Sequence, residues 1–496
     1  MGIKLFLLII FFAVMVGVGF YSRRHVKSVD GFVLGGRSVG PWLTAFAYGT
    51  SYFSAVVFVG YAGQFGWKYG IASTWIGIGN ALIGGLLAWV VLGRRTKVMT
   101  QHLRAKTMPD FFGQRYGSKA LKIVASVIVF VFLIPYTASV YNGLSRLFGM
   151  AFNIPYTWCV IAMAVFTAIY VILGGYMATA INDFIQGIIM LFGIVAVIAS
   201  VLNGQGGFME AVSKMAQIPS DVPATMGQPG AFTSFFGPDP LNLLGVVILT
   251  SLGTWGLPQM IGKFYAIKDE KSINTGTVIS TLFAIVISGG CYFLGGFGRL
   301  FDSAEIYNAE TGAVVYDSII PSMLSKLPDI LIGIVVVLVL SASMSTLSSL
   351  VLTSSSTMTL DLLKDNIMKE MSEKKQIITM QILIVFFIVV SVVIALDPPT
   401  FIAQLMGISW GALAGAFLAP FLYGLYWKGV TRAGVWAGFI AGVGITVSNM
   451  FIGYIASPIN AGAAAMVAGL VIVPLVSLVT PKLKKEDVDE IFTCYE

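Results

Sequence analysis

The sequence predicts an all-α membrane protein with about 13 transmembrane helices. Three observations support this fold class. The 496 residues are 57% hydrophobic and only 11% charged, whereas a soluble globular domain carries roughly 25% charged residues. Apolar runs of about 20 residues, each long enough to cross a bilayer as a helix, recur along the whole chain. The 55 glycines favour the close packing and broken helices of membrane proteins.

The predicted spans form a single transmembrane domain, 1–496, whose core is a five-plus-five inverted repeat with flanking helices. Because five is odd, the second set of spans enters the membrane from the opposite side to the first, as an inverted repeat requires. The two sets show no clear sequence similarity, so the evidence for the repeat is only that the topology permits it. We predict a first span at 3–21, repeat one at about 41–203, repeat two at about 239–426, two last spans at about 431–480 and a short tail at 481–496.

The lysines and arginines predict the orientation in the membrane. With the N-terminus outside, 24 of the 30 basic residues fall in cytoplasmic segments, as the positive-inside rule expects. The six left outside are Lys4, Lys68, Arg146, Lys214, Arg299 and Lys326. The prediction is a multi-pass protein of the cell membrane with a cytoplasmic C-terminus. The basic residues lie in short loops and form no basic domain, which excludes a nucleic-acid-binding protein.

Two predicted spans are interrupted near their middle. In the span near 41–67, small polar residues replace the aliphatic run at 48–55, and the span near 239–262 contains glycines and Pro258 at 250–259. Unwound backbone at membrane depth is tolerated where it lines a cavity or is buried in protein. Free carbonyls there coordinate cations, and helix N-termini face anionic groups. A proline kink with glycine packing is the alternative, and the first span of each set being interrupted favours a binding site.

Hydroxyl groups dominate 341–349 in the span near 328–360. Ser345, Ser348 and Ser349 recur at helical spacing and share one face. Such hydroxyls either supply oxygens to a hard cation or bond back to the helix carbonyls. Asp183, near the start of the span at 178–203, is an ionisable residue at a span and a candidate site residue. Its alternative role is an acidic residue in the first turn of a helix.

The same inventory argues against other functions. The chain has 2 histidines and 3 cysteines without metal or disulfide spacing, and only Asp183 is a candidate for chemistry at membrane depth. We therefore predict no enzyme and no catalytic residue. A transporter-like sensor would need an output domain, which the tail after residue 480 is too short to supply. A proton-coupled carrier of the same fold stays open.

Together these segments resemble the sodium:solute symporter family over nearly the whole chain. The matching motifs are Leu34-Gly35-Gly36-Arg37-Ser38-Val39-Gly40, Asp183-Phe184-Ile185-Gln186, Gly256-Leu257-Pro258-Gln259, Met344-Ser345-Thr346-Leu347-Ser348 and Trp427-Lys428-Gly429-Val430-Thr431-Arg432-Ala433-Gly434. The resemblance implies the inverted-repeat architecture of the leucine transporter. It also implies sodium-coupled symport of a small solute by alternating access, with the sodium ion as coupling ion.

The resemblance also implies residues for the ions. Sodium site one would use the carbonyls of Thr50, Phe53 and Ala342 and the hydroxyls of Ser345 and Thr346. A second sodium site, which only some members have, would match Asp183, Ser345, Ser348 and Ser349.

The identity of the solute follows less directly from the resemblance than the coupling ion does. Tyr136 and Pro258 match residues of the proline carriers, whereas Tyr52, Thr250 and Thr254 depart from them, and the interrupted spans are more similar to the pantothenate carriers. We predict a small carboxylate-bearing solute: pantothenate-like, a monocarboxylate or an amino acid, with a proline-type symporter as the alternative. The candidate pocket residues are Ser51, Tyr52, Ser54, Tyr136, Thr250, Thr254, Trp255 and Gln404. Core packing is the alternative role for Tyr136, Trp255 and Gln404. The predicted partners are the solute, sodium and membrane lipid, and the chain is expected to act as a monomer.

Overall fold

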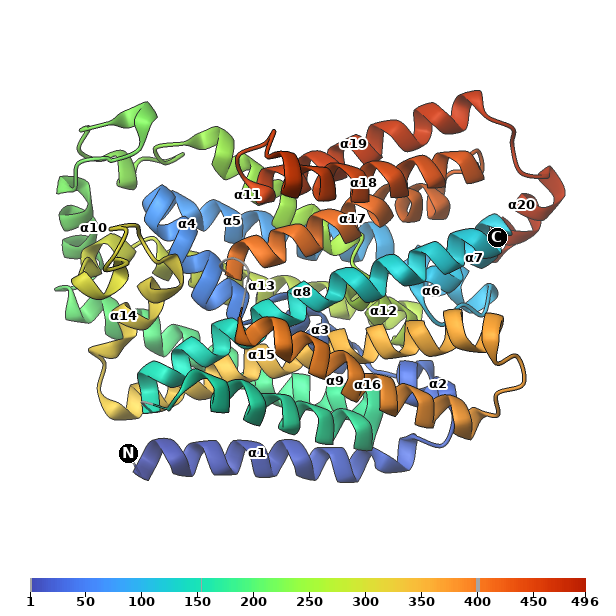
Figure 1. Cartoon of the computed structure of the whole chain (residues 1–496), viewed down its shortest axis with the longest axis horizontal. Helices are drawn as coiled ribbons and strands as arrows, with labels where there is room; N and C mark the ends of the chain where they lie inside the picture. The colour runs from blue at the N-terminus through green and yellow to red at the C-terminus, as the bar shows by residue number, and fades with distance from the viewer. Residues whose placement is uncertain (1, 153, 398–401) are drawn as a thin grey trace.

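The computed structural model describes residues 2–152, 154–397 and 402–496, without the side chain of His25. Within these residues the chain is built of helices, turns and two isolated bridges. Most long helices run along the longest axis of the molecule, and the two termini lie at opposite ends of that axis (Figure 1). The predicted all-α architecture is therefore confirmed.

The helices that shape the core are long, and several shorter ones flank them. The long helices are α1 (Gly2–Ser22), α8 (Lys119–Phe152), α9 (Tyr156–Gly204), α13 (Glu270–Gly295), α15 (Asp329–Thr357), α16 (Glu373–Leu396), α17 (Ile402–Tyr426), α18 (Arg432–Ile452) and α19 (Pro458–Val479). The shorter ones used below are α2 (Val29–Leu34), α3 (Pro41–Tyr52), η3 (Val56–Tyr61), α4 (Ala62–Tyr69), η5 (Asn80–Leu87), α6 (Arg94–His102), α7 (Met108–Tyr116), α10 (Phe208–Gln217), α11 (Pro240–Leu252), η9 (Gly253–Trp255), α12 (Pro258–Ala266), α14 (Ile319–Ser325), η13 (Met358–Ile367) and α20 (Lys485–Phe492).

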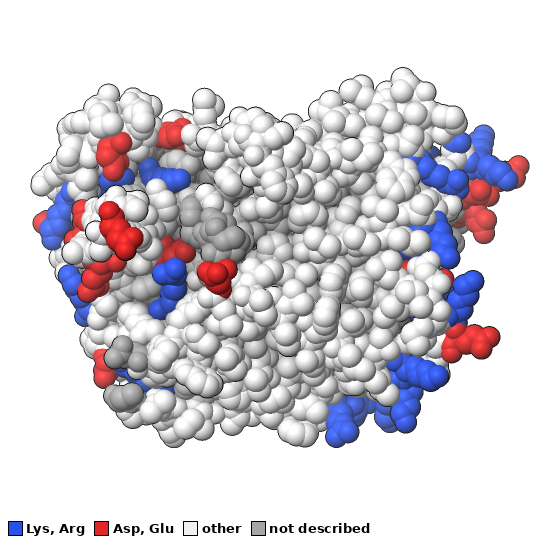
Figure 2. Space-filling view, viewed as in Figure 1, with Lys and Arg blue, Asp and Glu red and all other residues white. Residues whose placement is uncertain are grey.

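Charged side chains gather at the two ends of the molecule, and the visible face between them is almost free of charge (Figure 2). Large apolar side chains point outward along this middle band, for example Phe192, which is 76% exposed, and Ile440, which is 68% exposed. Such a band suits contact with lipid. We call the end with α6, α7 and α20 the basic end, because lysines and arginines predominate there, and the end with α10 and α14 the loop end (Figures 1 and 2).

The structure contains 10 helices long and apolar enough to cross a membrane, or 11 if the bent pair α11–α12 counts as one span, among the described residues. Two of these segments are long, Val56–His102 with 47 residues and Tyr156–Gly204 with 49. At about 1.5 Å per residue, each is roughly twice as long as the hydrocarbon core is thick. Gly70 and Gly175, both with positive φ, interrupt them. The exact number of 13 spans and the repeat boundaries stay predictions. Residue 153 of repeat one and residues 398–401 of repeat two lie outside the described residues.

Both predicted interruptions are confirmed. The helix α3 ends at Tyr52, Phe53 is extended (φ −112°, ψ 95°), and the chain resumes as η3 and α4. The second break separates α11 and η9 from α12, with a bend of 40°. Carbonyls in the last turn before such a break lose their helical partners, so these two positions offer backbone oxygens inside the protein.

The helix α15 lies at the centre of the bundle and packs against α1, α3, α8, α9 and α16. In its most apolar stretch 78% of the residues are buried, against 28% in α16. The hydroxyl-bearing residues at 341–349 are all buried: Ser341, Ser343, Ser345, Thr346, Ser348 and Ser349. These hydroxyls therefore face other protein groups and not lipid.

Candidate functional site

Four of the five residues predicted for sodium site one converge between α3 and α15. The Ser345 hydroxyl donates to the Thr50 carbonyl at 2.9 Å and to the Ala342 carbonyl at 3.1 Å. The Thr346 hydroxyl lies 3.3 Å from the Thr50 carbonyl and 3.1 Å from the Ala342 carbonyl. Phe53 is the extended residue that follows α3. We call these five residues the neutral site, because every oxygen in it is uncharged.

The neutral site is buried, with Thr50, Ser345 and Thr346 all at 0% exposure. Its hydroxyl hydrogens can rotate away from the centre, so the same oxygens that now accept or donate hydrogen bonds can instead face a cation. Hard cations prefer several oxygen ligands. The arrangement therefore has the chemistry of a site for a small hard cation that enters without a counter-charge.

The residues predicted for a second sodium site are divided by the structure. Asp183 on α9 and Ser349 on α15 both approach Lys263 of α12, whose ammonium lies 3.8 Å from Asp183 Oδ2 and 3.0 Å from Ser349 Oγ. The Ser348 hydroxyl instead donates to the Ser345 carbonyl at 2.9 Å. The Ser345 hydroxyl belongs to the neutral site. We call Asp183, Lys263 and Ser349 the charged site.

The orientation prediction places Lys263 among the 24 basic residues of cytoplasmic segments. Its location in the structure corrects that placement. The side chain is 2% exposed and lies inside the protein. The reason is the break at Gly256 and Leu257, which turns α12 inward, so a residue close to the end of the predicted span faces Asp183. A lysine five residues after a span-breaking proline is the only local signal that could have indicated this position.

A hydrogen bond connects the two sites. The hydroxyls of Ser51 and Ser349 lie 2.8 Å apart, and either can be the donor. Ser51 directly follows Thr50, whose carbonyl belongs to the neutral site, and Ser349 lies one turn after Ser345 on the same face of α15. The predicted pocket residue Ser51 therefore lies between the two sites.

Aromatic side chains surround the break in α3. The Tyr52 ring stacks on Trp410 of α17 with their centroids 6.0 Å apart, and the Tyr136 ring of α8 meets Trp410 edge-on at 5.9 Å. The Tyr52 hydroxyl donates to the Thr250 carbonyl at 2.6 Å, which joins the two broken spans. We call Tyr52, Tyr136 and Trp410 the aromatic pocket. Trp410 was not among the predicted residues, since one tryptophan in an apolar helix carries no pattern.

The other predicted pocket residues have backbone partners or lie elsewhere. The Ser54 hydroxyl accepts from the Val56 amide at 3.1 Å and so caps η3. Thr254 donates to the Gly84 carbonyl at 3.2 Å and Trp255 to the Ile83 carbonyl at 3.0 Å, both on η5. Gln404 lies half-buried near the start of α17. These contacts hold the second break against η5 next to the aromatic pocket.

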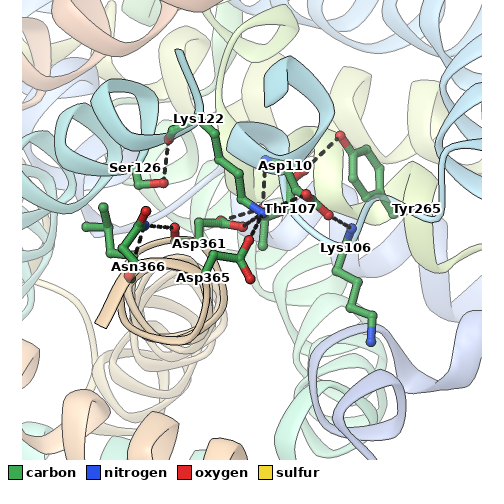
Figure 3. Close-up of polar contacts among 10 residues, drawn as sticks. Lys106, Thr107, Asp110, Lys122, Ser126, Tyr265, Asp361, Asp365 and Asn366 are labelled. Carbon is green, nitrogen blue, oxygen red and sulfur yellow. Dashed lines mark hydrogen bonds and ion pairs between the residues drawn. The ribbon is translucent and has the colours of Figure 1, made fainter. Parts of the chain in front are cut away.

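A cluster of charges gathers around Lys122 near the basic end (Figure 3). The Lys122 ammonium is 2.8 Å from Asp110 Oδ1, 3.3 Å from Asp361 Oδ1 and 2.5 Å from Asp365 Oδ2. Thr107 donates to Asp361 at 2.5 Å. We call Lys122 and these three aspartates the basic-end cluster, which joins α7, α8 and η13.

A cavity extends from the charged site to Thr107, which donates to Asp361 of the basic-end cluster. Its lining includes Lys263 and Ser349 at one end and Thr107 and Lys106 toward the basic end. Tyr265 of α12 also lines it, and the Tyr265 hydroxyl reaches the Thr107 carbonyl at 3.5 Å. The helix α12 thus forms a wall of this cavity, and its Tyr265 reaches Thr107 beside the basic-end cluster.

Comparisons with known proteins identify the family. The family model described as "Sodium:solute symporter family" matches residues 32–442. The chain belongs to the sodium:solute symporter family. It is 30% identical to the sodium/proline symporter of Staphylococcus aureus strains JH9 and NCTC 8325, over 96% of this chain and 92% of each relative. Membership of this symporter family makes the chain a sodium-coupled membrane transporter and not an enzyme.

Solved structures give the same fold. A Na⁺-coupled sialic acid symporter in a substrate-bound outward-open state superposes with a TM-score of 0.79 at 15% identity, covering 97% of this chain and 98% of that one. A nucleobase-cation-symport-1 family transporter in a closed conformation with bound bromovinylhydantoin superposes with a TM-score of 0.54 at 13% identity, covering 93% and 98%. The predicted fold class of the sodium:solute symporter family is confirmed.

Proposed function

We propose that this protein carries a small carboxylate-bearing solute together with sodium by alternating access, and that the sodium binds at the neutral site. The observation that carries the proposal is the convergence of the Ser345 and Thr346 hydroxyls on the carbonyl of Thr50, the last turn before a break at membrane depth. An ion there bridges a broken span and the central helix α15, so its binding favours one arrangement of the two.

Sodium suits the neutral site better than a proton does. A coupling proton needs a group that binds it, and the neutral site offers only carbonyl and hydroxyl oxygens. A hard cation needs several such oxygens and no full negative charge. The proton-coupled carrier thus remains the weaker alternative.

The aromatic pocket indicates the kind of solute. Tyr52, Tyr136 and Trp410 present ring faces and edges to an apolar body, and all three side chains are uncharged. The negative group of the solute would face the amide groups at the start of η3 and α12, because helix N-termini attract anions. A pantothenate-like acid, another monocarboxylate or an amino acid fits this description. The sodium/proline symporters among its relatives favour a proline-type amino acid as the second candidate.

The basic end would face the cytoplasm and the N-terminus the outside, in the cell membrane. The excess of lysine and arginine at that end supports this orientation (Figure 2). One chain contains both sites and the pocket, so the protein would act as a monomer.

The cycle would run on the sodium gradient and the membrane potential. One sodium ion that moves inward down 100 mV contributes about 2.3 kcal/mol before its concentration gradient is counted. Binding of sodium would order the end of α3 and, through Tyr52, the aromatic pocket. Linkage requires that the solute raise the affinity for sodium by the same factor as sodium raises the affinity for the solute.

A thermal-shift screen tests the proposal. Purified protein is heated with small carboxylates and amino acids, once in sodium chloride and once in choline chloride at the same pH. We expect one chemical class to raise the melting temperature only when sodium is present, because a ligand that binds the native state stabilises it. Stabilisation of equal size in choline would contradict sodium coupling.

A further inference from the structure

We infer that the ammonium of Lys263 occupies the second cation position of this transporter, so that the protein binds and carries a single sodium ion. The inference rests on the proposed sodium binding at the neutral site and adds to it which cation fills the other position. It starts from the charged site, where a carboxylate and a hydroxyl from two different helices meet a lysine from the broken span.

The first argument concerns the charge of Asp183. This carboxylate is 0% exposed, and neither of its oxygens has a hydrogen-bond partner among the described residues. A buried carboxylate without a compensating cation is costly. Either a free cation or a tethered one can provide the compensation. The Lys263 ammonium at 3.8 Å is the cation that the chain itself provides.

The second argument concerns geometry. The ammonium contacts Ser349 Oγ at 3.0 Å, and its distance to Asp183 is too long for a direct hydrogen bond. It also lies 5.3 Å from the centre of the Tyr176 ring, which attracts cations. The site therefore surrounds one positive charge with oxygens and a ring face. A sodium ion and an ammonium group carry the same charge, so either one leaves the site equally compensated, and they exclude each other.

The third argument concerns what a tethered cation can do. Lys263 is part of α12 and cannot leave with the solute, so a position that it fills moves no charge across the membrane. It still reaches the neutral site through the Ser349–Ser51 hydrogen bond of 2.8 Å. Lys263 thus acts as a permanent structural cation beside a transported one, and the expected stoichiometry is one sodium ion per cycle.

Binding of radioactive sodium to the purified full-length protein tests this inference without knowledge of the solute. We expect the wild type to bind one ²²Na⁺ per chain with a Hill coefficient near one. Lys263→Met, which has a similar length and no charge, should bind two sodium ions, with a Hill coefficient above one. Lys263→Arg, which keeps the charge, should again bind one.

The partner variants decide where the added ion binds. Lys263→Met combined with Asp183→Asn should return the stoichiometry to one, because the carboxylate that attracted the second ion is gone. Asp183→Asn alone should still bind one ion. If Lys263→Met does not fold, the Asp183→Asn variant decides. One bound sodium ion, as in the wild type, supports the inference, and fewer ions than in the wild type overturn it.

The outcomes separate this inference from the proposed function. A wild type that binds two sodium ions, or a folded Lys263→Met that binds only one, overturns the role of Lys263 and leaves sodium coupling at the neutral site intact. A wild type with no saturable sodium binding overturns the proposed function instead.

Discussion

The neutral site and the charged site lie one helical turn apart on α15 but use opposite chemistry. At the neutral site Ser345 and Thr346 meet a backbone carbonyl of the broken helix α3, and no group carries a charge. At the charged site Ser349 meets a lysine and an aspartate that are both buried. The same helix thus presents hydroxyls to the proposed sodium site and to a buried lysine.

This contrast in charge suggests how a transporter can keep a transported ion separate from a fixed cation. Neutral oxygens stabilise an ion without leaving a buried charge behind when it departs. A buried carboxylate keeps its requirement for a cation at every step of the cycle, and removal of that cation is strongly destabilising. An ion at the neutral site can therefore be released with the solute, whereas the cation at the charged site has to stay.

Breaking the charged pair should have the largest effect, and it should fall on stability. Asp183→Asn leaves the Lys263 ammonium buried without its carboxylate, which we expect to cost about 3–5 kcal/mol. Thermal unfolding of the purified protein measures the loss. The double variant Asp183→Asn with Lys263→Met should recover most of it, since neither charge then remains. A double variant as unstable as Asp183→Asn alone would show that the two side chains do not act as a pair.

Removing the hydroxyls of the neutral site should have the next largest effect, and it should fall on sodium. Ser345→Ala with Thr346→Val removes two oxygens from a charged ligand, each worth about 1.5 kcal/mol or more. The sodium concentration for half-maximal binding should rise about a hundredfold. Ser343→Ala is the matched control, because its hydroxyl donates to the Val339 carbonyl of its own helix. Unchanged sodium affinity in the double variant would show that sodium does not bind at the neutral site.

The basic-end cluster has the same lysine–aspartate chemistry as the charged site but lies nearer to water. The side chains of Lys122 and Asp365 are 13% and 39% exposed, although that of Asp361 is 1% exposed, whereas those of Lys263 and Asp183 are 3% and 0% exposed. Lys122→Met should therefore cost less than Asp183→Asn, about 1–3 kcal/mol, and thermal unfolding measures it. Lys119→Met, an exposed lysine in the first turn of the same helix, is the control and should change little. A larger loss for Lys122→Met than for Asp183→Asn would contradict the role given to burial.

The smallest predicted effect lies in the aromatic pocket. Trp410→Phe keeps a ring beside Tyr52 and Tyr136 but shortens it, and an aromatic pair is worth about 1 kcal/mol beyond its buried area. Affinity for the solute found by the thermal-shift screen should fall about fivefold. Sodium binding without solute should stay as in the wild type. Equal losses of sodium and solute affinity would mean that Trp410 supports the fold and not the pocket.

Much of the fold could be predicted because its signals are local. Apolar runs and basic loops define helices and ends, and the glycines and proline at 250–259 define the second break without any knowledge of neighbours. The neutral site followed from a family motif in which Ser345 and Thr346 are adjacent in sequence. Each of these features is contained within a short stretch of chain.

The missed residues depend on contacts between distant segments. Lys263 lies near the end of a predicted span, where a lysine normally faces water, and only the bend of α12 turns it toward Asp183. Lys122 of α8 meets Asp361 and Asp365 of η13, and no periodicity connects those positions. Trp410 similarly acquires its role from α3 and α8, which it contacts across the bundle.

Solute uptake into proteoliposomes tests sodium coupling through the neutral site. The solute found by the screen is added outside the proteoliposomes, and the pH is held equal on both sides. The wild type should accumulate the solute when an inwardly directed sodium gradient is present and not when choline replaces sodium. Ser345→Ala with Thr346→Val should need about a hundredfold more sodium for the same rate. Accumulation of equal size in choline, or equal sodium dependence in the double variant, would contradict sodium coupling through the neutral site.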